Sequence, residues 1–192
     1  MAVVAARTSG SVPTTSGNSI LNLSRFLSEC HGPGAFAAVL AELASEDATA
    51  LSGIILPQIQ YPTASYIAAV DAACRLFDPD RMPEQFGKWA AHSTMNSLFR
   101  FLLKFTSPAW CVSRGTRIWR TFHSTGEWET EIGERSFRGT LRDFAIVDGN
   151  YCRVVAGWIR GAGRLTGADI FTVSHPRCRS SGSPVCVFTA EW

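Results

Sequence analysis

Long apolar segments are missing from this chain of 192 residues. None of its runs approaches the ~18 apolar residues needed to cross a bilayer. The opening MAVVAARTSG also lacks the basic start and the long apolar core of a signal peptide. We therefore expect a cytoplasmic protein without a membrane span. In that compartment its six cysteines are expected to be reduced thiols or metal ligands rather than disulfides.

An excess of charge of one sign is missing too, because the formal net charge is only +2. The basic residues are almost all arginine, which we interpret as the codon bias of a GC-rich genome. The balance gives no electrostatic reason to expect nucleic acid or an anionic membrane as a partner.

Recognisable catalytic motifs are lacking as well. The glycine-containing segment 161–164 follows a predicted helix, whereas a phosphate-binding loop lies between a strand and a helix. The glutamates of residues 127–131 alternate along one predicted strand and fit a solvated face better than an acid–base pair. Cys111 and His123 have no third group to orient them as a nucleophile pair. We therefore expect that the protein is not an enzyme.

The length allows one well-buried core but not two full domains. Residues 1–19 are rich in serine, threonine and glycine, which predicts a disordered tail, and residues 20–192 are predicted to form a single domain. Apolar periodicity and helix-start signals predict helices first, over residues 20–29, 35–43, 63–77, 83–105 and 107–122. Alternation then predicts a strand, a partner strand, a helix and two short strands, over 127–132, 136–144, 149–161, 170–174 and 185–190. This order indicates an α+β fold with N-terminal helices packed on an antiparallel sheet.

Four potential metal ligands lie towards the end of the sequence. Cys152 heads a predicted helix, His175 and Cys178 flank Pro176 in a tight turn, and Cys186 follows a loop of serine, glycine and proline. Sets of four thiolates and imidazoles are the usual ligands of structural zinc, so the pattern predicts one structural zinc ion. Two alternatives stay open. The thiols could be ordinary core residues, or Cys178 and Cys186 could pair across a hairpin in an exported protein.

The segment from Cys152 to Cys186 resembles the C-terminal part of the V4R (4-vinyl reductase) domain family. The resemblance is carried by a cysteine at the head of a helix, a Gly-aromatic step, a second glycine, two further cysteines and a closing strand, at Cys152, Gly157, Trp158, Gly161, Cys178, Cys186, Val187, Phe188 and Trp192. His175 stands where the sensors of that family carry a carboxylate. The resemblance implies a fold related to trafficking-complex subunits, an effector-sensing role, and a zinc ion held by Cys152, His175, Cys178 and Cys186. It also implies a homodimer, because such domains commonly self-associate.

A second resemblance extends further upstream. Residues 86–94 (FGKWAAHST), the Ser107-Pro108 step and the C-terminal cysteine pattern resemble an uncharacterised myxobacterial family of similar length. That family brings no known activity, so it adds nothing on function.

One face of the long predicted helix carries Trp89, His92, Asn96 and Phe99 at helical spacing. This face is either the wall of a ligand pocket, with His92 and Asn96 as polar contacts, or a core face with one satisfied histidine. Aromatic residues are concentrated between positions 86 and 128. They favour a small, largely apolar ligand, aromatic or acyl, that enters between this helix and the first hairpin.

The leading interpretation is a non-catalytic domain that senses or binds a small apolar molecule and is stabilised by structural zinc. The alternative is a protein–protein adaptor of the same fold that has no ligand. A cavity bounded by Trp89, His92 and Phe99 would favour the sensor. A solid core there, with an exposed apolar patch elsewhere, would favour the adaptor.

Overall fold

The computed structural model describes residues 12–94, 107–166 and 171–192. Helices form most of the first half of this part of the chain, and their bounds are α1 (Gly17–His31), α2 (Ala35–Ala41), α3 (Ser45–Leu51), α4 (Thr63–Leu76) and α5 (Met82–Thr94). Two short strands, β1 (Thr14–Ser16) and β2 (Gln60–Pro62), pair antiparallel. Phe26 and Leu27 of α1 are almost fully buried, so the apolar face of this helix anchors the helical core.

Strands and shorter helices form the second half. Helices α7 (Pro108–Val112) and α8 (Gly115–Phe122) precede β3 (Glu127–Ile132) and β4 (Ser136–Arg142), and α9 (Gly149–Arg164) precedes β5 (Thr172–Arg177) and β6 (Cys186–Glu191). A short 3-10 turn, Arg179–Ser181, lies between the last two strands. The sheet is antiparallel, in the order β3-β4-β6-β5. The strand latest in sequence therefore lies inside the sheet.

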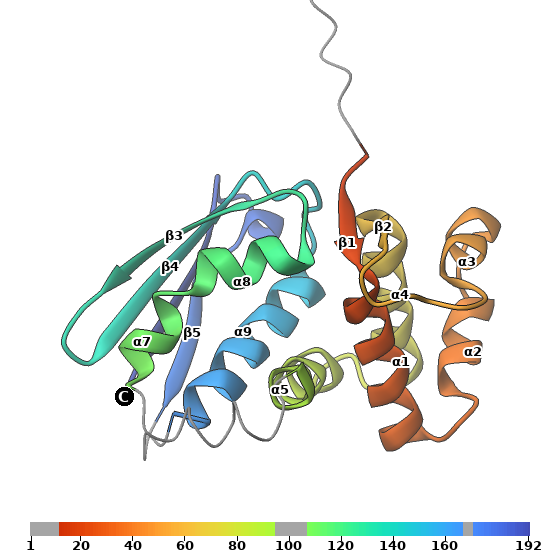
Figure 1. Ribbon diagram of the computed structural model, residues 1–192, viewed down its shortest axis with the longest axis horizontal. Helices are drawn as coiled ribbons and strands as arrows, with labels where there is room; N and C mark the ends of the chain where they lie inside the picture. The colour runs from red at the N-terminus through yellow and green to blue at the C-terminus, as the bar shows by residue number, and fades with distance from the viewer. Residues whose placement is uncertain (1–11, 95–106, 167–170) are drawn as a thin grey trace, which may run out of the picture.

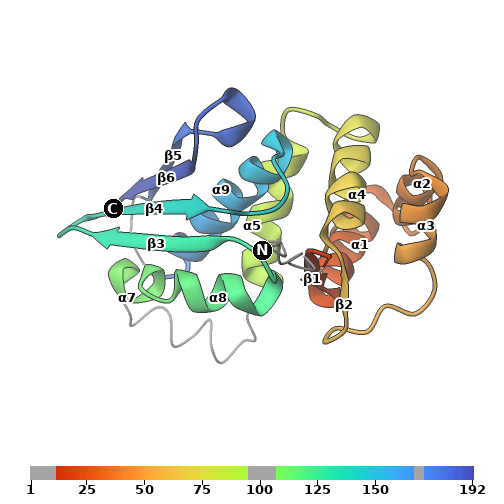
Figure 2. The same cartoon turned by 90° about the horizontal axis from the view of Figure 1, so that it is seen from above.

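The two halves meet at α5 and α9. Figures 1 and 2 show α1 to α4 on one side of the molecule, the four-stranded sheet on the other, and α5 and α9 between them. Helices α7 and α8 lie beside β3 at the outer part of the sheet (Figure 2). Residues on α5 and α9 can therefore contact both halves.

Glycines let α5 and α9 pack closely. A Cβ atom on Gly157 would lie 2.4 Å from the carbonyl oxygen of Glu84, and one on Gly87 would lie 2.1 Å from the carbonyl oxygen of Val154. Backbone atoms cannot move aside as a flexible side chain can, so both positions require glycine. Glu84 also forms an ion pair with Arg160 across this contact. The contact fixes α9, which supplies much of the cavity wall described below.

Most of the secondary structure agrees with the sequence-based expectation. The α+β class is confirmed. The alternating segment 127–132 corresponds residue for residue to β3, with Trp128 buried. The predicted helix over 63–77 corresponds to α4. None of the helices among the described residues is long and apolar enough to span a membrane.

Other elements differ from the expectation. The predicted tail over 1–19 is too long, because β1 begins at Thr14 and α1 at Gly17. Helix α3 has no predicted counterpart, because only Leu51 in it is buried and apolar periodicity is lacking. The helix predicted over 107–122 is divided between α7 and α8. The long helix predicted over 83–105 is described as far as Thr94, since residues 95–106 lie outside the described part of the chain.

Candidate functional site

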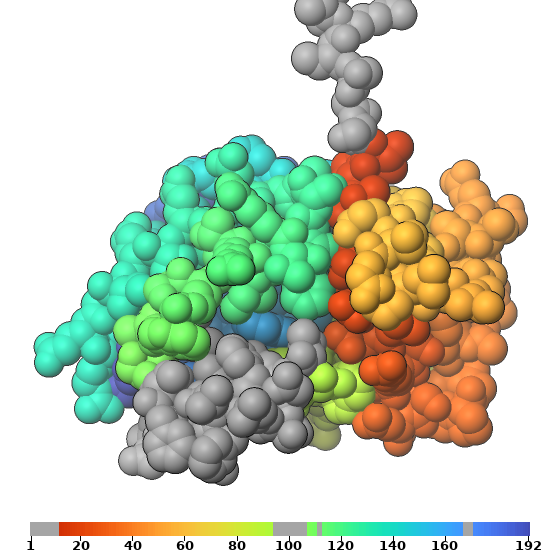
Figure 3. Space-filling view, viewed as in Figure 1, coloured from red at the N-terminus to blue at the C-terminus, as the bar shows by residue number. Residues whose placement is uncertain are grey.

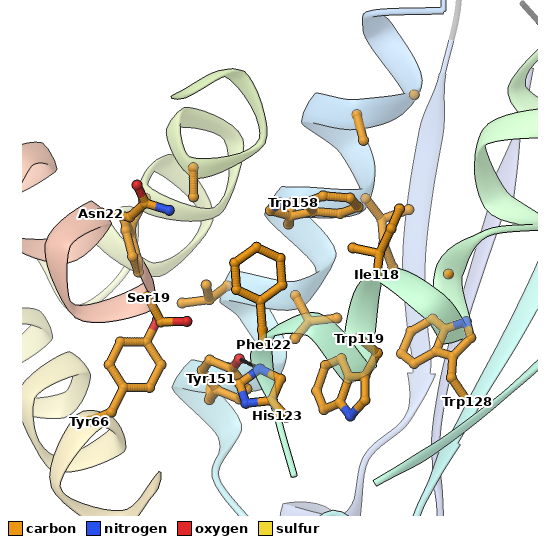
Figure 4. A pocket seen from close by; sticks show the side chains of 18 of the residues that line it. Ser19, Asn22, Tyr66, Ile118, Trp119, Phe122, His123, Trp128, Tyr151 and Trp158 are labelled. Atoms are coloured by element: carbon orange, nitrogen blue, oxygen red, sulfur yellow. Dashed lines mark hydrogen bonds between the residues drawn. The ribbon is translucent and has the colours of Figure 1, made fainter. Parts of the chain in front are cut away.

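A largely apolar cavity of about 130 Å³ lies where the two halves meet. In the space-filling view, part of α9 is visible in a hollow between α8 and α1 (Figure 3). Ser19 and Asn22 of α1 face the cavity from the helical half, and Ile118 of α8 and Trp128 of β3 face it from the sheet half (Figure 4). The remaining described lining residues are Tyr66, Phe86, Ala90, Pro108, Gly115, Trp119, Phe122, Phe137, His123, Tyr151, Val154, Val155, Trp158, Ile159, Ala162 and Gly163.

Helix α8 contributes to this cavity because it is amphipathic. Ile118, Trp119 and Phe122 recur at helical spacing and line the cavity. Arg117 and Arg120 lie on the opposite side of the helix and are exposed. Helix α8 therefore presents an aromatic face to the interior and a basic face to solvent.

A buried histidine closes the polar end of the cavity. His123, which directly follows α8, lies 2.6 Å from the Tyr151 hydroxyl through Nε2 and 3.2 Å from Thr15 Oγ1 through Nδ1. Tyr151 is held in place because the cap residue of α9, Asp148, accepts a hydrogen bond from the Tyr151 backbone N–H at 2.6 Å. The ring of Phe144 stacks on that of Tyr151. His123 thus connects β1 of the helical half to α9.

The hydrogen bonds define the tautomer of His123. Thr15 Oγ1 donates to the carbonyl oxygen of Phe122 at 3.0 Å, and a carbonyl oxygen can only accept. The single proton of Thr15 is therefore engaged, and Thr15 accepts from His123 Nδ1–H. His123 Nε2 then carries no proton and accepts from the Tyr151 hydroxyl. The Tyr151 hydroxyl therefore donates its only proton to His123 Nε2. Its oxygen can still accept a further hydrogen bond.

Burial keeps both groups of this pair neutral. Desolvation lowers the pKa of His123 to about 3 and raises the pKa of Tyr151 well above its usual value. At neutral pH the cavity therefore presents no charge at its polar end. No charged side chain is among the described residues that line it.

The predicted ligand residues lie elsewhere. Trp89 is half-buried, and its indole N–H donates to Glu29 of α1 at 2.8 Å. His92 is exposed, and neither residue lines the cavity. Asn96 and Phe99 lie outside the described residues. On α5, Phe86 and Ala90 line the cavity instead.

Sequence reasoning missed the polar end of the cavity. His123 was expected to have no orienting group, because its partners are distant in sequence: Thr15 lies 108 residues away and Tyr151 lies 28 residues away. The available signal was the position of His123 directly after an amphipathic aromatic helix.

The structure brings the four predicted metal ligands together. The ligand atoms of Cys152, His175, Cys178 and Cys186 all lie within 4.8 Å of one another. The imidazole of His175 also stacks on the ring of Phe188, with 4.3 Å between centroids. Cys152 lies on α9, His175 on β5 and Cys186 on β6. Cys178 lies just after β5, at the start of the short 3-10 turn.

Two thiols of the cluster are hydrogen-bonded to each other. Cys152 Sγ lies 3.5 Å from Cys186 Sγ. This hydrogen bond lowers the pKa of Cys186 and raises that of Cys152. A backbone N–H from Arg179 and the imidazole of His175 also favour the thiolate at Cys186. The cluster therefore holds a sulfur that is readily ionised, as a ligand for a soft metal requires.

Sequence comparisons give no relatives for this chain. No protein-family model and no curated protein matches it.

The structure, in contrast, is similar to solved H-NOX proteins. One is the H-NOX protein from S. oneidensis in the Fe(II)NO ligation state, with a TM-score of 0.70, 13% identity, and coverage of 92% of this chain and 98% of that chain. Another is the Fe(II) unliganded H-NOX protein from K. algicida, with a TM-score of 0.67, 7% identity, and coverage of 92% and 95%. A third is an oxygen-binding H-NOX domain related to soluble guanylate cyclases, with a TM-score of 0.61, 10% identity, and coverage of 91% of each chain.

The chain has the H-NOX fold. This finding corrects the V4R resemblance and the fold relationship to trafficking-complex subunits, because the similar solved structures are H-NOX domains. The V4R resemblance rested on a short cysteine and glycine pattern across α9, β5 and β6, and that local arrangement occurs here within an H-NOX fold. The expected zinc cofactor is corrected as well, since the metal named for the H-NOX neighbours is Fe(II).

Proposed function

We propose that the chain is a non-catalytic H-NOX-fold domain that senses a small, largely apolar molecule. The observation that carries this proposal is the cavity of about 130 Å³ between the two halves. Largely apolar clefts and cavities with a few placed polar groups are typical binding sites for small ligands. The H-NOX neighbours include NO, CO and oxygen complexes, which supports a sensing role for this fold. The adaptor of the same fold stays the alternative, because Trp89 and His92, which were expected to bound the deciding cavity, do not line this one.

The position of the cavity suggests how binding would be transmitted. A ligand there would contact α1 and α4 of the helical half together with α8 and α9 of the sheet half. His123 is bonded to both sides, through Thr15 and Tyr151. A ligand that contacts this pair would therefore alter how the halves meet, provided that it binds one arrangement better than the other.

Cavity filling tests the proposed function. Ala162 lines the cavity and is 3% exposed, so Ala162→Leu would occupy part of the space. Ala38, on α2, is exposed and remote from the cavity, so Ala38→Leu is the matched control. Compounds that bind the native state raise the melting temperature by mass action. We expect small aromatic or acyl compounds to raise the melting temperature of wild type and of Ala38→Leu, but not that of Ala162→Leu. If no compound raises it, or if Ala162→Leu responds as wild type does, the cavity is not a binding site.

We also propose that Cys152, His175, Cys178 and Cys186 are ligands of one thiolate-preferring metal ion, separate from the cavity. The support is their chemistry and their approach to within 4.8 Å of one another. Such an ion would join α9 to the β5–β6 hairpin and so stabilise the sheet half. Elemental analysis of protein purified without added metal should find one ion per chain, and it would identify the element. Metal-free protein in which the three cysteines of the cluster are freely titratable would contradict the proposal.

Self-association has no test in the described residues. The homodimer expected from the V4R resemblance stays a prediction, and so does the cytoplasmic location. Light scattering over a wide concentration range would test the dimer, and a constant monomer mass would contradict it.

A further inference from the structure

Heme is the group that this fold implies, because H-NOX domains bind heme. Histidine is a frequent axial ligand of heme iron. All four histidines of the chain lie in its described part. His31 stacks on Phe77 at 4.2 Å, His92 is exposed, and His175 belongs to the cysteine cluster. Only His123 lines the cavity, and both of its ring nitrogens are engaged in hydrogen bonds.

The size and charge of the cavity also disagree with heme. Its volume of about 130 Å³ is close to that of an engineered cavity of about 150 Å³ that holds benzene. A porphyrin is several times larger than a benzene ring. Heme also carries two carboxylates, and no arginine or lysine is among the described lining residues to pair with them. The described residues therefore do not fit heme.

We infer that this cavity takes, in place of heme, a neutral molecule of one aromatic ring that carries a hydrogen-bond donor. The inference rests on the proposed function and specifies its ligand. The volume limits the ligand to about one ring. The apolar lining and the neutral His123–Tyr151 pair disfavour a charged ligand, because a charge moved there from water would have no partner.

The donor requirement follows from Tyr151. Its proton is engaged with His123 Nε2, so its oxygen can only accept. Ser19 and Asn22 also line the cavity, but hydroxyl and amide groups can donate or accept and therefore do not discriminate. A ring with a hydroxyl or N–H group can donate to the Tyr151 oxygen, whereas an equally large ring without one leaves that acceptor unpaired. Since a net hydrogen bond contributes about 1 kcal/mol, the preference should be about fivefold.

Heme binding is tested by titrating the full chain with ferrous heme and recording the Soret absorbance, with the S. oneidensis H-NOX protein as the positive control. We expect no saturable change in the Soret band for this chain. A one-to-one complex with a shifted Soret band would overturn the inference. It would leave the proposed sensing function standing, so the two failures are distinguishable.

The ligand class is tested by calorimetry with phenol and toluene, which have almost the same size and shape. Wild type is compared with the double variant Tyr151→Phe and His123→Phe, because Tyr151→Phe alone would leave His123 Nε2 as an unpaired acceptor that phenol could use. We expect this double variant, which removes both acceptors, to weaken phenol binding about fivefold while toluene binding changes less than about twofold. Equal weakening of both compounds would mean that the Tyr151–His123 pair is only structural, and it would overturn the donor requirement.

Wild type alone keeps the inference falsifiable if the double variant does not fold. Anisole differs from phenol only in a methyl group that replaces the donated proton. We expect phenol to bind more tightly than anisole, although anisole is the more apolar compound. Anisole binding as tightly as phenol would overturn the donor requirement. Failure of every ring compound to bind would overturn both this inference and the proposed function of the cavity.

Discussion

The close contact between α5 and α9 makes Gly157→Ala a sharp test of the structure. In a helix, alanine is favoured over glycine by about 1 kcal/mol, so helix propensity alone predicts stabilisation. The structure predicts the opposite, because the new Cβ would lie 2.4 Å from the carbonyl oxygen of Glu84 and 3.0 Å from its carbonyl carbon. The two helix backbones must then separate. Overpacking of this kind typically costs about 1–3 kcal/mol, so we expect a net loss of up to about 2 kcal/mol after the propensity gain.

The assay is urea unfolding followed by circular dichroism, together with the melting temperature. For a chain of this size each kcal/mol corresponds to about 2–4 °C, so Gly157→Ala should melt up to about 8 °C lower than wild type. Gly34→Ala is the steric control, because a Cβ there would meet nothing within 4 Å. Gly34 is the N-cap of α2, where alanine is less favourable than glycine, so this variant should show at most a small loss of stability. A Gly157→Ala variant that is more stable than wild type, as helix propensity alone predicts, would refute the close approach of α5 to α9.

Three further predictions concern single side chains. Burial and the neighbouring Asp71 raise the pKa of Asp148 to about 6, so its ionisation costs stability as the pH rises from about 4 through about 6. Asp148→Asn keeps the cap, so its free energy of unfolding at pH 7 should equal that of wild type or exceed it by about 1 kcal/mol after solvent screening. The difference between the two proteins should vanish below about pH 4, as measured by urea unfolding. Lys88 lowers the pKa of Glu84. Wild type should therefore be more stable than Glu84→Gln above about pH 5, and this difference should decrease as the pH falls below about 4. High salt should reduce the difference as well. Trp89→Phe removes a hydrogen bond outside the cavity, so it should leave the affinity for any cavity ligand within about twofold by calorimetry while lowering the melting temperature slightly.

Local patterns predicted the elements that depend on local physics. Alternation located β3 because one face of that strand is wet and the other carries the buried Trp128. The spacing of thiols and imidazole located the Cys152–Cys186 cluster, because its members lie on adjacent elements at one end of α9. Gly157 lies inside the helix predicted over 149–161, but the sequence could not indicate that this glycine approaches the backbone of Glu84.

The cavity could not be predicted because its walls come from distant segments. Periodicity on α5 identified a face with Trp89 and His92, but packing of α5 against α9 turned Phe86 and Ala90 towards the cavity instead. His123 acquires its role only when β1 is placed beside it, and β1 lay in the segment predicted to be disordered. The resemblance to V4R domains failed for a related reason: a motif of about forty residues constrains one end of α9 and the β5–β6 hairpin, and it leaves the arrangement of the helical half open.

The interior position of β6 bears on how this molecule is assembled. Strand β6 pairs with β4 on one side and with β5 on the other, so neither neighbour has its full set of backbone partners until the segment from Cys186 onwards is in place. During synthesis the helical half can therefore fold first. Until β6 is made, β3 and β4 form a hairpin in which one edge of β4 has no partner strand. Open edges of this kind recruit strands from other chains. A shortened version that ends before Cys186 should accordingly give aggregates rather than a smaller folded unit, and a chaperone that shields the edge of β4 would act at the step where this chain is most vulnerable.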